Sequence, residues 1–174
     1  MAVFMSSVSI YSHQYNPSRL DDLIDINPIQ DMVTAHYRAS HIPLSIIDAS
    51  DARVLVAAGW QEICAKFHRQ HPDTKQRCID SDLDFVPPAQ GQAIAYVCHN
   101  GLQHVGIPIF VDQVHVATIF LGQFLYQRDE ETRQFFQKQG QHCGFDLTAY
   151  MQAFEQVPVF SPEHVTNVIE YNTA

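Results

Sequence analysis

The stretch Ala95-Tyr96-Val97-Cys98-His99-Asn100-Gly101-Leu102 decides the interpretation of this chain. Aromatic and β-branched residues at its start predict a strand, and the Asn-Gly pair near its end favours a tight turn. Two apolar segments follow directly, His104–Val111 and Val114–Leu125, and both predict strands. Because side chains alternate along a strand, Cys98 and His99 should leave it on opposite faces of the sheet. The sequence thus predicts three consecutive strands, with a thiol and an imidazole where the first one ends.

The segments upstream predict one helix, a strand hairpin and two more helices. Asn27 as N-cap and Pro28 at the first helical position predict the opening helix, which runs to Ser40. The other upstream elements are a strand at Leu44–Asp48, its hairpin partner at Arg53–Ala57, a helix at Trp60–Gln70, and a helix that opens with the capping box Asp73-Thr74-Lys75-Gln76 and stops before Pro87-Pro88.

Downstream of the three strands the sequence predicts helices. Asp129 and Asp146 begin two of them, and the pair Ser161-Pro162 caps a third. This order of elements is that of an α+β, PAS-like domain, a five-stranded antiparallel sheet with helices inserted after strand two and with flanking helices. We therefore expect an N-terminal tail at residues 1–19, a PAS-like domain at residues 20–160, and the start of a C-terminal connector helix at residues 161–174.

Composition and charge limit the classes of function. The chain has 174 residues and a net charge of −9, from 10 Lys and Arg against 19 Asp and Glu. Because the chain has no run of basic residues, we do not expect this segment to bind nucleic acid. Polar residues interrupt every long apolar run, so no membrane span is predicted, and the N-terminus lacks the basic start of a signal peptide. We expect a cytoplasmic protein whose four cysteines are free thiols or metal ligands.

A group of soft metal ligands lies in the helices before the central stretch. Cys64, His68 and His71 fall on one helix face, and Cys78 follows in the next helix. Together with Cys98, these side chains could supply the tetrahedral thiolate and imidazole ligands that zinc or another soft metal prefers. The competing interpretation is that Cys64 packs in the core while the histidines face water. The chain has no C-x-x-C pair to support the metal alternative.

Glycines inside the expected strands suggest where another group approaches the sheet. Gly106 and Gly122 stand in segments otherwise rich in β-branched residues, and glycine there often marks a close approach. We expect a ligand or a helix to lie against the sheet at these positions. Gln123 follows in an apolar run, where a buried amide needs hydrogen-bond partners. Trp60, the single tryptophan, could wall a pocket or belong to the core.

The run from Tyr96 to Leu102 resembles the Tyr-x-Cys-His-x-Gly-Leu signature of the PocR family of sensory domains. Where that signature often has Ala, this chain has Asn100. The resemblance extends from Leu23 to Gln127, and the segments most similar to the family are 25–48, 64–82 and 108–123. It implies a variant PAS-like fold that binds a small hydrocarbon derivative, such as a short diol or polyol, and signals to an output module.

On this resemblance we expect a non-enzymatic sensory domain of bacterial signal transduction and transcription regulation. Its partners would be the small molecule, an output module of the same polypeptide (a kinase, a diguanylate cyclase or a DNA-binding region) and a second copy of the chain. The pocket should lie between the sheet and the helices of residues 60–86, without a cofactor. The ligand-binding residues we expect are Trp60, Cys64, Phe67, Cys78, Tyr96, Cys98, His99, Leu102, Gly106, Gly122 and Gln123.

Two alternative functions remain open. The first is a metal or redox sensor that uses Cys64, Cys78 and Cys98, with His68 as a further metal ligand. The second is a thiol enzyme that uses Cys98 with a distant histidine such as His68 or His115. For that enzyme the sequence offers neither an orienting third group nor an oxyanion-binding glycine loop.

The C-terminal helix bears on the oligomeric state. Val165, Val168 and Ile169 fall on one face of this helix. We expect a homodimer formed through the opening and closing helices, with the last helix continuing toward the output module. The competing interpretation is that this apolar face packs back on its own domain as a lid.

Overall fold

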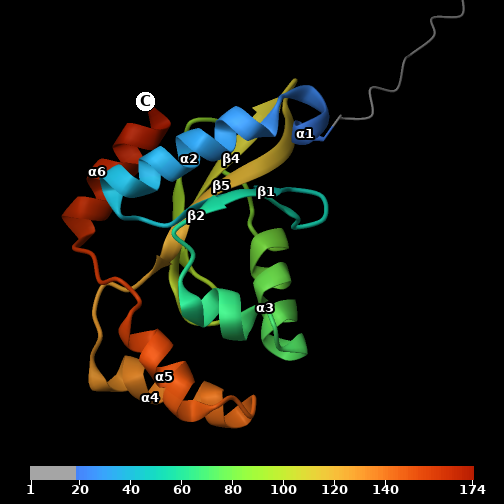
Figure 1. The fold of residues 1–174 in the computed structure, drawn as a ribbon. Helices are drawn as coiled ribbons and strands as arrows, with labels where there is room; N and C mark the ends of the chain where they lie inside the picture. The colour runs from blue at the N-terminus through green and yellow to red at the C-terminus, as the bar shows by residue number, and fades with distance from the viewer. Residues whose placement is uncertain (1–18) are drawn as a thin grey trace, which may run out of the picture.

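The computed structural model describes residues 19–174, which form a five-stranded antiparallel sheet with helices on both faces (Figure 1). The strand order is β2-β1-β5-β4-β3, and the four pairings are antiparallel. This arrangement confirms the α+β, PAS-like fold expected from the sequence. The expected N-terminal tail lies outside the described residues, except for Arg19. The strands are β1 (Leu44–Asp48), β2 (Val54–Ala58), β3 (Ile94–Val97), β4 (Gln103–Val111) and β5 (Val114–Phe124).

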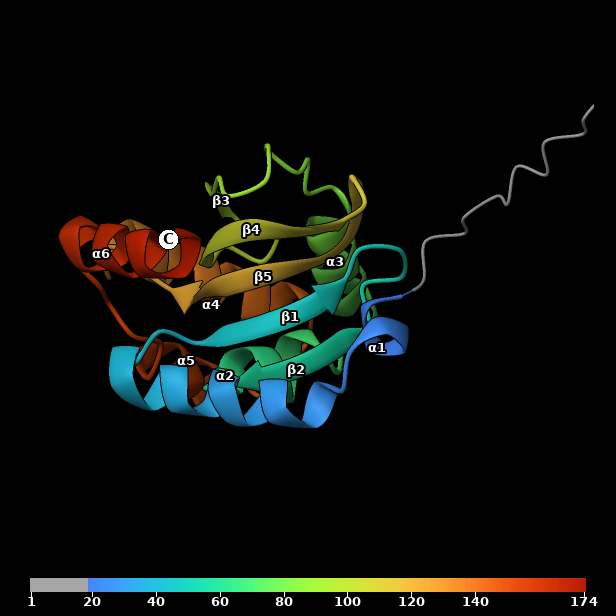
Figure 2. The same cartoon turned by 90° about the horizontal axis from the view of Figure 1, so that it is seen from above.

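The helices lie on both sides of this sheet. Figure 1 shows α2 and α6 on one side and α3 on the other, and Figure 2 shows α2 running alongside β2 and β1. In the part of the chain that the structure describes, no helix is long and apolar enough to cross a membrane. The helices are α1 (Leu20–Leu23), α2 (Ile26–Ser40), the π-helical turn η1 (Ile63–His68), α3 (Pro72–Leu83), α4 (Glu130–His142), α5 (Leu147–Glu155) and α6 (Pro162–Thr173).

Apolar side chains fill the space between the sheet and the helices α2 and α6. Leu44 and Ile46 point to this face of β1 and belong to the same buried cluster as Val33 of α2. Val165 and Val168 of α6 lie in that cluster too, with only 2% and 8% of their surface exposed. These two valines therefore pack back on their own domain, as the competing interpretation holds. The connector helix and the domain boundary at residue 160 stay predictions.

A second core joins α4 and α5 to the rest of the domain. Phe136 of α4 and Tyr150 of α5 are fully buried together with Ile63 of η1. Leu102, which follows the β3–β4 turn, is also fully buried in this cluster. The helical hairpin α4–α5 thus packs against η1 and the turn, beside the sheet face that α3 covers.

Three helix starts differ from the sequence prediction. The N-cap of α2 is Asp25, not Asn27, and its side chain accepts a hydrogen bond from Asn27 N at 3.0 Å; Asp and Asn serve equally well at this position. The helix expected from Trp60 is only the short turn η1. The N-cap of α3 is His71, which accepts from Asp73 N at 3.3 Å, and Pro72 takes the first helical position.

The end of the central stretch is a turn and not a strand, so strand alternation does not set the directions of Cys98 and His99. β3 ends at Val97. Gly101 N donates to Cys98 O at 2.7 Å, and Cys98 N donates to Leu102 O at 2.8 Å. The turn needs a positive φ at Gly101, which is 94°. Strand alternation ends before both residues, because the turn begins two residues earlier than the Asn-Gly pair suggests.

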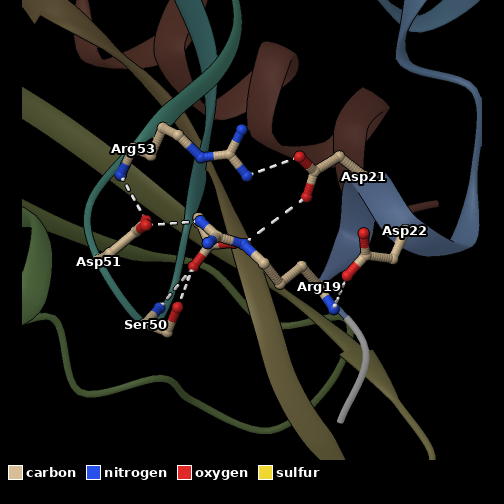
Figure 3. Close-up of polar contacts among 7 residues, drawn as sticks. Arg19, Asp21, Asp22, Ser50, Asp51 and Arg53 are labelled. Atoms are coloured by element: carbon tan, nitrogen blue, oxygen red, sulfur yellow. Dashed lines mark hydrogen bonds and ion pairs between the residues drawn. The ribbon is translucent and has the colours of Figure 1, made fainter.

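A cluster of ion pairs anchors the N-terminal end of the described chain to the β1–β2 turn (Figure 3). Arg19 lies 3.3 Å from Asp48 and 2.5 Å from Asp51, measured from its nitrogens to their carboxylate oxygens. Arg53 pairs with Asp21 of α1 at 2.6 Å. Most of these side chains are exposed, and each such pair stabilises a fold by only about 0–1 kcal/mol. We assign this cluster a structural role.

Candidate functional site

The sheet face that α3 covers carries polar and small residues. On this face Tyr96 of β3 lies opposite His104 of β4, and His104 lies opposite Gly122 of β5. Gly106 lies opposite Phe120. The face therefore combines two polar rings with two glycines at neighbouring strand positions, where a purely structural sheet would carry apolar side chains.

A small cavity of about 20 Å³ lies between this face, η1 and α3. Such a volume suffices for about one water molecule. Polar side chains dominate its wall, and they come from segments that are distant in the sequence. The wall residues are Cys64, His68, Arg69, Cys78, Ser81, Asp82, Cys98, Asn100, His104 and Gln123.

A larger cavity of about 240 Å³ adjoins the first one. Ser81 of α3 lines both cavities, and its hydroxyl accepts a hydrogen bond from His99 N at 2.7 Å. Tyr96 contributes its ring to the larger cavity. The remaining wall comes from the connection between α3 and β3, from the edge of β3 and from the turn, namely Asp84, Phe85, Val86, Ile94 and His99.

A β-bulge turns Gln123 into the small cavity. Gln103 pairs with Phe124 and His104 pairs with Gly122, so Gln123 is an extra residue in β5. Its φ is 83°, a left-handed value that is strained for a residue with a side chain. Its Oε1 accepts a hydrogen bond from Gln61 N at 2.6 Å, just before η1. The bulge therefore satisfies the buried amide and ties η1 to the sheet.

A buried hydrogen-bond network centres on His68. Its Nε2 lies 2.8 Å from Tyr150 OH and 3.1 Å from Gln139 Oε1, and the tyrosine hydroxyl donates to the same Gln139 oxygen. His68 Nδ1 lies 3.9 Å from the Cys64 sulfur. A neutral ring with its proton on Nε2 satisfies all of these contacts. Burial lowers the pKa of His68 to about 4, so the ring is neutral at physiological pH.

Asn100 joins the turn to two helices, α3 and α4. Its amide nitrogen donates to Thr74 O at 2.8 Å and lies 3.1 Å from the sulfur of Cys78, both on α3. Its oxygen accepts from Gln139 Nε2 at 3.4 Å, so it also extends the His68 network. Asn100 is only 1% exposed, which makes it a buried connector and not a surface turn residue.

One ion pair lies at the edge of the small cavity. Arg69 donates to Asp82 of α3 at 3.0 Å, and the guanidinium lies 4.5 Å above the Trp60 ring. The Asp82 side chain is 4% exposed. Burial raises the pKa of Asp82 to about 6, even though the neighbouring Arg69 acts in the opposite direction. The two charges compensate each other inside the domain.

The thiols in the cavity wall are neutral groups. Burial raises the pKa of Cys78 to about 11, and it also raises the pKa of Cys64 and of Cys98. Cys98 Sγ accepts a hydrogen bond from Leu102 N at 3.4 Å, within the turn. A nucleophilic cysteine needs a lowered pKa, so the environment of Cys98 does not favour the thiol-enzyme alternative. His115 bonds Thr118 at 2.8 Å instead.

The four residues of the metal alternative line one cavity, because Cys64, His68, Cys78 and Cys98 all contribute to its wall. Among residues 19–174, however, no three His, Cys, Asp or Glu side chains are grouped so that they could hold a metal ion.

The residues expected to bind ligand separate into two groups. Cys64, Cys78, Cys98 and Gln123 meet at the small cavity, and Tyr96 and His99 line the larger one. The other group lies elsewhere. Leu102 is buried in the α4–α5 core, Phe67 packs on Phe145 and Tyr150, and Trp60 supports Arg69.

The two glycines each make room for a ring. A Cβ at Gly106 would lie 2.3 Å from the ring of Phe85, and one at Gly122 would lie 2.8 Å from the ring of His104. The expected close approach is therefore made by aromatic and imidazole side chains.

Sequence reasoning missed several residues of this site, foremost His104, Phe85 and Asn100. His104 could have been found, because it stands two residues before Gly106 on a predicted strand and therefore shares its face. Phe85 and Asn100 carry no such signal, since a loop residue and a turn residue reach the cavity only through the tertiary fold.

A comparison with protein-family models places this arrangement among known domains. The model described as the sensory domain found in PocR matches residues 22–174, nearly the whole chain. Comparisons with curated proteins and with solved structures gave no significant match.

Proposed function

The chain belongs to the family of sensory domains found in PocR, and on this premise we propose that it binds a small, uncharged, hydroxyl-bearing molecule between α3 and the sheet. One observation carries the proposal beyond the family. Two adjoining cavities lie on the sheet face that α3 covers, and buried polar groups line them. Binding sites for small molecules combine enclosure with a few polar groups in this way.

The charges around the site favour an uncharged ligand. Arg69 and Asp82 neutralise each other at 3.0 Å. Burial lowers the pKa of His68 and of His104 to about 4, and the cavity thiols keep their protons. An anionic ligand would lose its hydration shell without meeting an unpaired positive charge, which is costly. A neutral diol or polyol meets hydrogen-bonding groups that are neutral as well.

The size of the site favours a ligand of a few heavy atoms. The larger cavity has a volume of about 240 Å³, below the ~300–1,000 Å³ of sites for drug-sized molecules. A groove of about 430 Å³ on the opposite side, between α2, α6 and the sheet, is larger. That groove is lined almost wholly by apolar side chains, and its polar residues His36 and Asn172 bond each other at 3.0 Å. It offers a hydroxyl-bearing ligand little recognition.

Calorimetric titration and thermal shift test this proposal. The panel consists of ethane-1,2-diol, propane-1,2-diol, propane-1,3-diol and glycerol, with propan-1-ol and acetate as controls. We expect saturable binding of at least one diol, together with a raised melting temperature. Gly122→Ala should weaken that binding, because the new methyl group displaces the His104 ring. Binding of acetate alone, or of none of these compounds, would contradict the proposal.

Elemental analysis of the same protein tests the metal-sensor alternative, which stays a prediction. Under the present proposal a variant with serine at Cys64, Cys78 and Cys98 keeps the metal content of the parent. One zinc ion per chain that is lost in this variant, with a large drop in melting temperature, would favour the metal sensor instead.

We also propose how occupancy of the site reaches an output module of the same polypeptide, be it a kinase, a diguanylate cyclase or a DNA-binding region. Asn100 and His68 connect the cavity wall to Gln139 of α4 and Tyr150 of α5 by hydrogen bonds. A ligand that moves the turn or η1 must rearrange these bonds, which biases the position of α4 and α5. Pairing of two copies through α2 and α6 is our further expectation, and Met32 and Tyr171 are exposed there.

A further inference from the structure

Two buried polar atoms on residues of the cavity walls have no hydrogen-bond partner among residues 19–174. They are the hydroxyl of Tyr96 and Nδ1 of His104. An unsatisfied buried polar atom destabilises a fold, and native structures contain few of them. Both atoms belong to the sheet face that α3 covers. Two such atoms on neighbouring strands of one face call for a group that satisfies them.

The two side chains form one unit across neighbouring strands. Tyr96 and His104 lie directly opposite each other in the β3–β4 pairing, and their ring centroids are 5.6 Å apart. Tyr96 lines the cavity of about 240 Å³, whereas His104 lines the cavity of about 20 Å³. The pair therefore stands where the two cavities meet.

The ring of Phe85 covers the sheet next to this pair. Its centroid lies 6.2 Å from that of Tyr96 and 5.6 Å from that of Phe120. Gly106 provides the space, because a Cβ there would come within 2.3 Å of the Phe85 ring. Phe85 belongs to the connection between α3 and β3 and not to either element.

We propose that Tyr96 and His104 form a subsite for a single alcohol group, and that the carbon atoms of the ligand take the place over Gly106 that Phe85 now fills. The ligand hydroxyl accepts a hydrogen bond from the Tyr96 hydroxyl and donates one to Nδ1 of His104. Ser81 lines both cavities, and its hydroxyl group would meet a second hydroxyl group of the ligand. This inference rests on the proposed function and names the groups that recognise the ligand.

Hydrogen-bonding capacity explains why the group is an alcohol. With the imidazole proton on Nε2, the pair presents one donor and one acceptor, and a hydroxyl supplies the complementary acceptor and donor. An ether or ketone oxygen can only accept a hydrogen bond, so it would bond the Tyr96 hydroxyl and leave Nδ1 of His104 without a partner. An ammonium group can only donate, so it would bond Nδ1 of His104 and leave the proton of the Tyr96 hydroxyl without an acceptor. A charged ligand would also have to give up its hydration at this buried place.

Tyr96→Phe tests the subsite by two measurements that should respond differently, the melting temperature without ligand and the affinity for the diol. Without ligand, the variant should melt at the same temperature as the parent or higher, because it removes an unsatisfied hydroxyl. Its affinity for the tightest-binding diol of the panel should fall about tenfold, the range for one buried hydrogen bond. Tyr126→Phe is the matched control: Tyr126 is 36% exposed and lines neither cavity, so this variant should keep the diol affinity of the parent within about threefold.

Ligand chemistry and a third variant complete the test. Methylating the bound hydroxyl of the diol removes its donation to Nδ1 of His104 but not its acceptance from Tyr96, so the loss of affinity should be similar in the parent and in Tyr96→Phe. Phe85→Ala should bind the diol more tightly, because the ligand no longer displaces a ring.

Each outcome decides the inference. If the parent binds a diol and Tyr96→Phe binds it equally well, the subsite is wrong while the proposed function stands. If Tyr96→Phe melts clearly lower than the parent without ligand, the hydroxyl has a partner and the subsite is wrong. If the parent binds no member of the panel, the proposed function fails and the subsite fails with it.

Discussion

The sheet face under α2 and α6 differs in chemical character from the face under η1 and α3. On the first face, Leu44, Ile46 and Val105 pack with apolar residues of both helices. On the second face, Tyr96 and His104 lie next to Gly106 and Gly122, and two cavities lie between the sheet and α3. The same five strands thus carry an apolar core on one side and a polar site on the other.

The difference separates the face that contributes most of the stability, under α2 and α6, from the face that can carry a binding site, under η1 and α3. Burial of apolar surface stabilises the first face by about 25 cal/mol for each Å² removed from water. The second face has a smaller apolar cluster around Ile47 and Phe120, together with single hydrogen bonds that each contribute only about 1 kcal/mol. Loss of one bond on that face should leave the domain folded. The following predictions test this contrast, from the largest expected effect to the smallest.

Placing a charge in the apolar face should have the largest effect. Val165 of α6 is 2% exposed, so Val165→Asp should lower the free energy of unfolding by about 4 kcal/mol or unfold the domain. Urea denaturation followed by circular dichroism measures this loss. Asn167→Asp is the control, because it adds the same charge at an exposed position of the same helix. Equal stability of the two variants would contradict the packing of α6.

Acid should weaken the polar face through its neutral histidines. Burial lowers the pKa of His68 and of His104 from 6.5 to about 4. The folded state favours the uncharged rings, so this stabilisation is fully present above pH 6.5 and is lost as the pH falls through 4. We expect each histidine to lower the free energy of unfolding by about 3 kcal/mol between pH 7 and pH 4.

Asp82 should oppose this loss in part. Burial raises its pKa from 3.8 to about 6, so its stabilising effect is fully present below pH 3.8 and disappears as the pH rises through 6. Urea titrations at several pH values should therefore give a steeper acid loss in Asp82→Asn and a shallower one in His68→Gln. An unchanged acid dependence in His68→Gln would show that His68 does not contribute.

Removing one connector of the network should have a moderate effect. Asn100→Ala leaves Thr74 O and the Gln139 amide without their partner, so the free energy of unfolding should fall by about 2 kcal/mol. His99→Ala, one position earlier in the turn, removes an exposed side chain and should change it by less than ~0.5 kcal/mol. Equal losses in the two variants, measured by urea denaturation, would mean that the buried network is not what holds the turn.

Much of the fold, but little of the site, could be predicted from the sequence. The strands β4 and β5 are long apolar segments, and their period and length define them locally. The helical starts at Asp129, Asp146 and Ser161 follow from caps that act within three residues. These elements depend on neighbours in the sequence, so local rules place them.

The site depends on partners that lie far apart in the chain. Asn100 meets Gln139, a separation of 39 residues, and Gln123 meets Gln61, a separation of 62 residues. The bulge that turns Gln123 toward the cavity has no signature in its side chains, since non-glycine residues rarely adopt its φ of 83°. The family resemblance indicated which residues matter. Their contacts required the tertiary structure.

The smallest effect on stability is expected at the outer surface of α2 and α6. Tyr171 is 75% exposed and Met32 is 65% exposed, so Tyr171→Ser and Met32→Ser should leave the free energy of unfolding almost unchanged. In our expectation of a homodimer through these helices, the double variant should be a monomer in light scattering at concentrations where the parent is a dimer. A monomeric parent at high concentration would contradict the expected pairing.

The central claim is that the ligand binds on the face under α3, and nuclear magnetic resonance of the backbone amides during a titration with propane-1,2-diol tests it most directly. The account predicts saturable shifts at Tyr96, Gly106 and Gly122 and constant positions for Met32 and Tyr171. Shifts confined to Met32, Ala39 and Tyr171, around the apolar groove between α2 and α6, would contradict it.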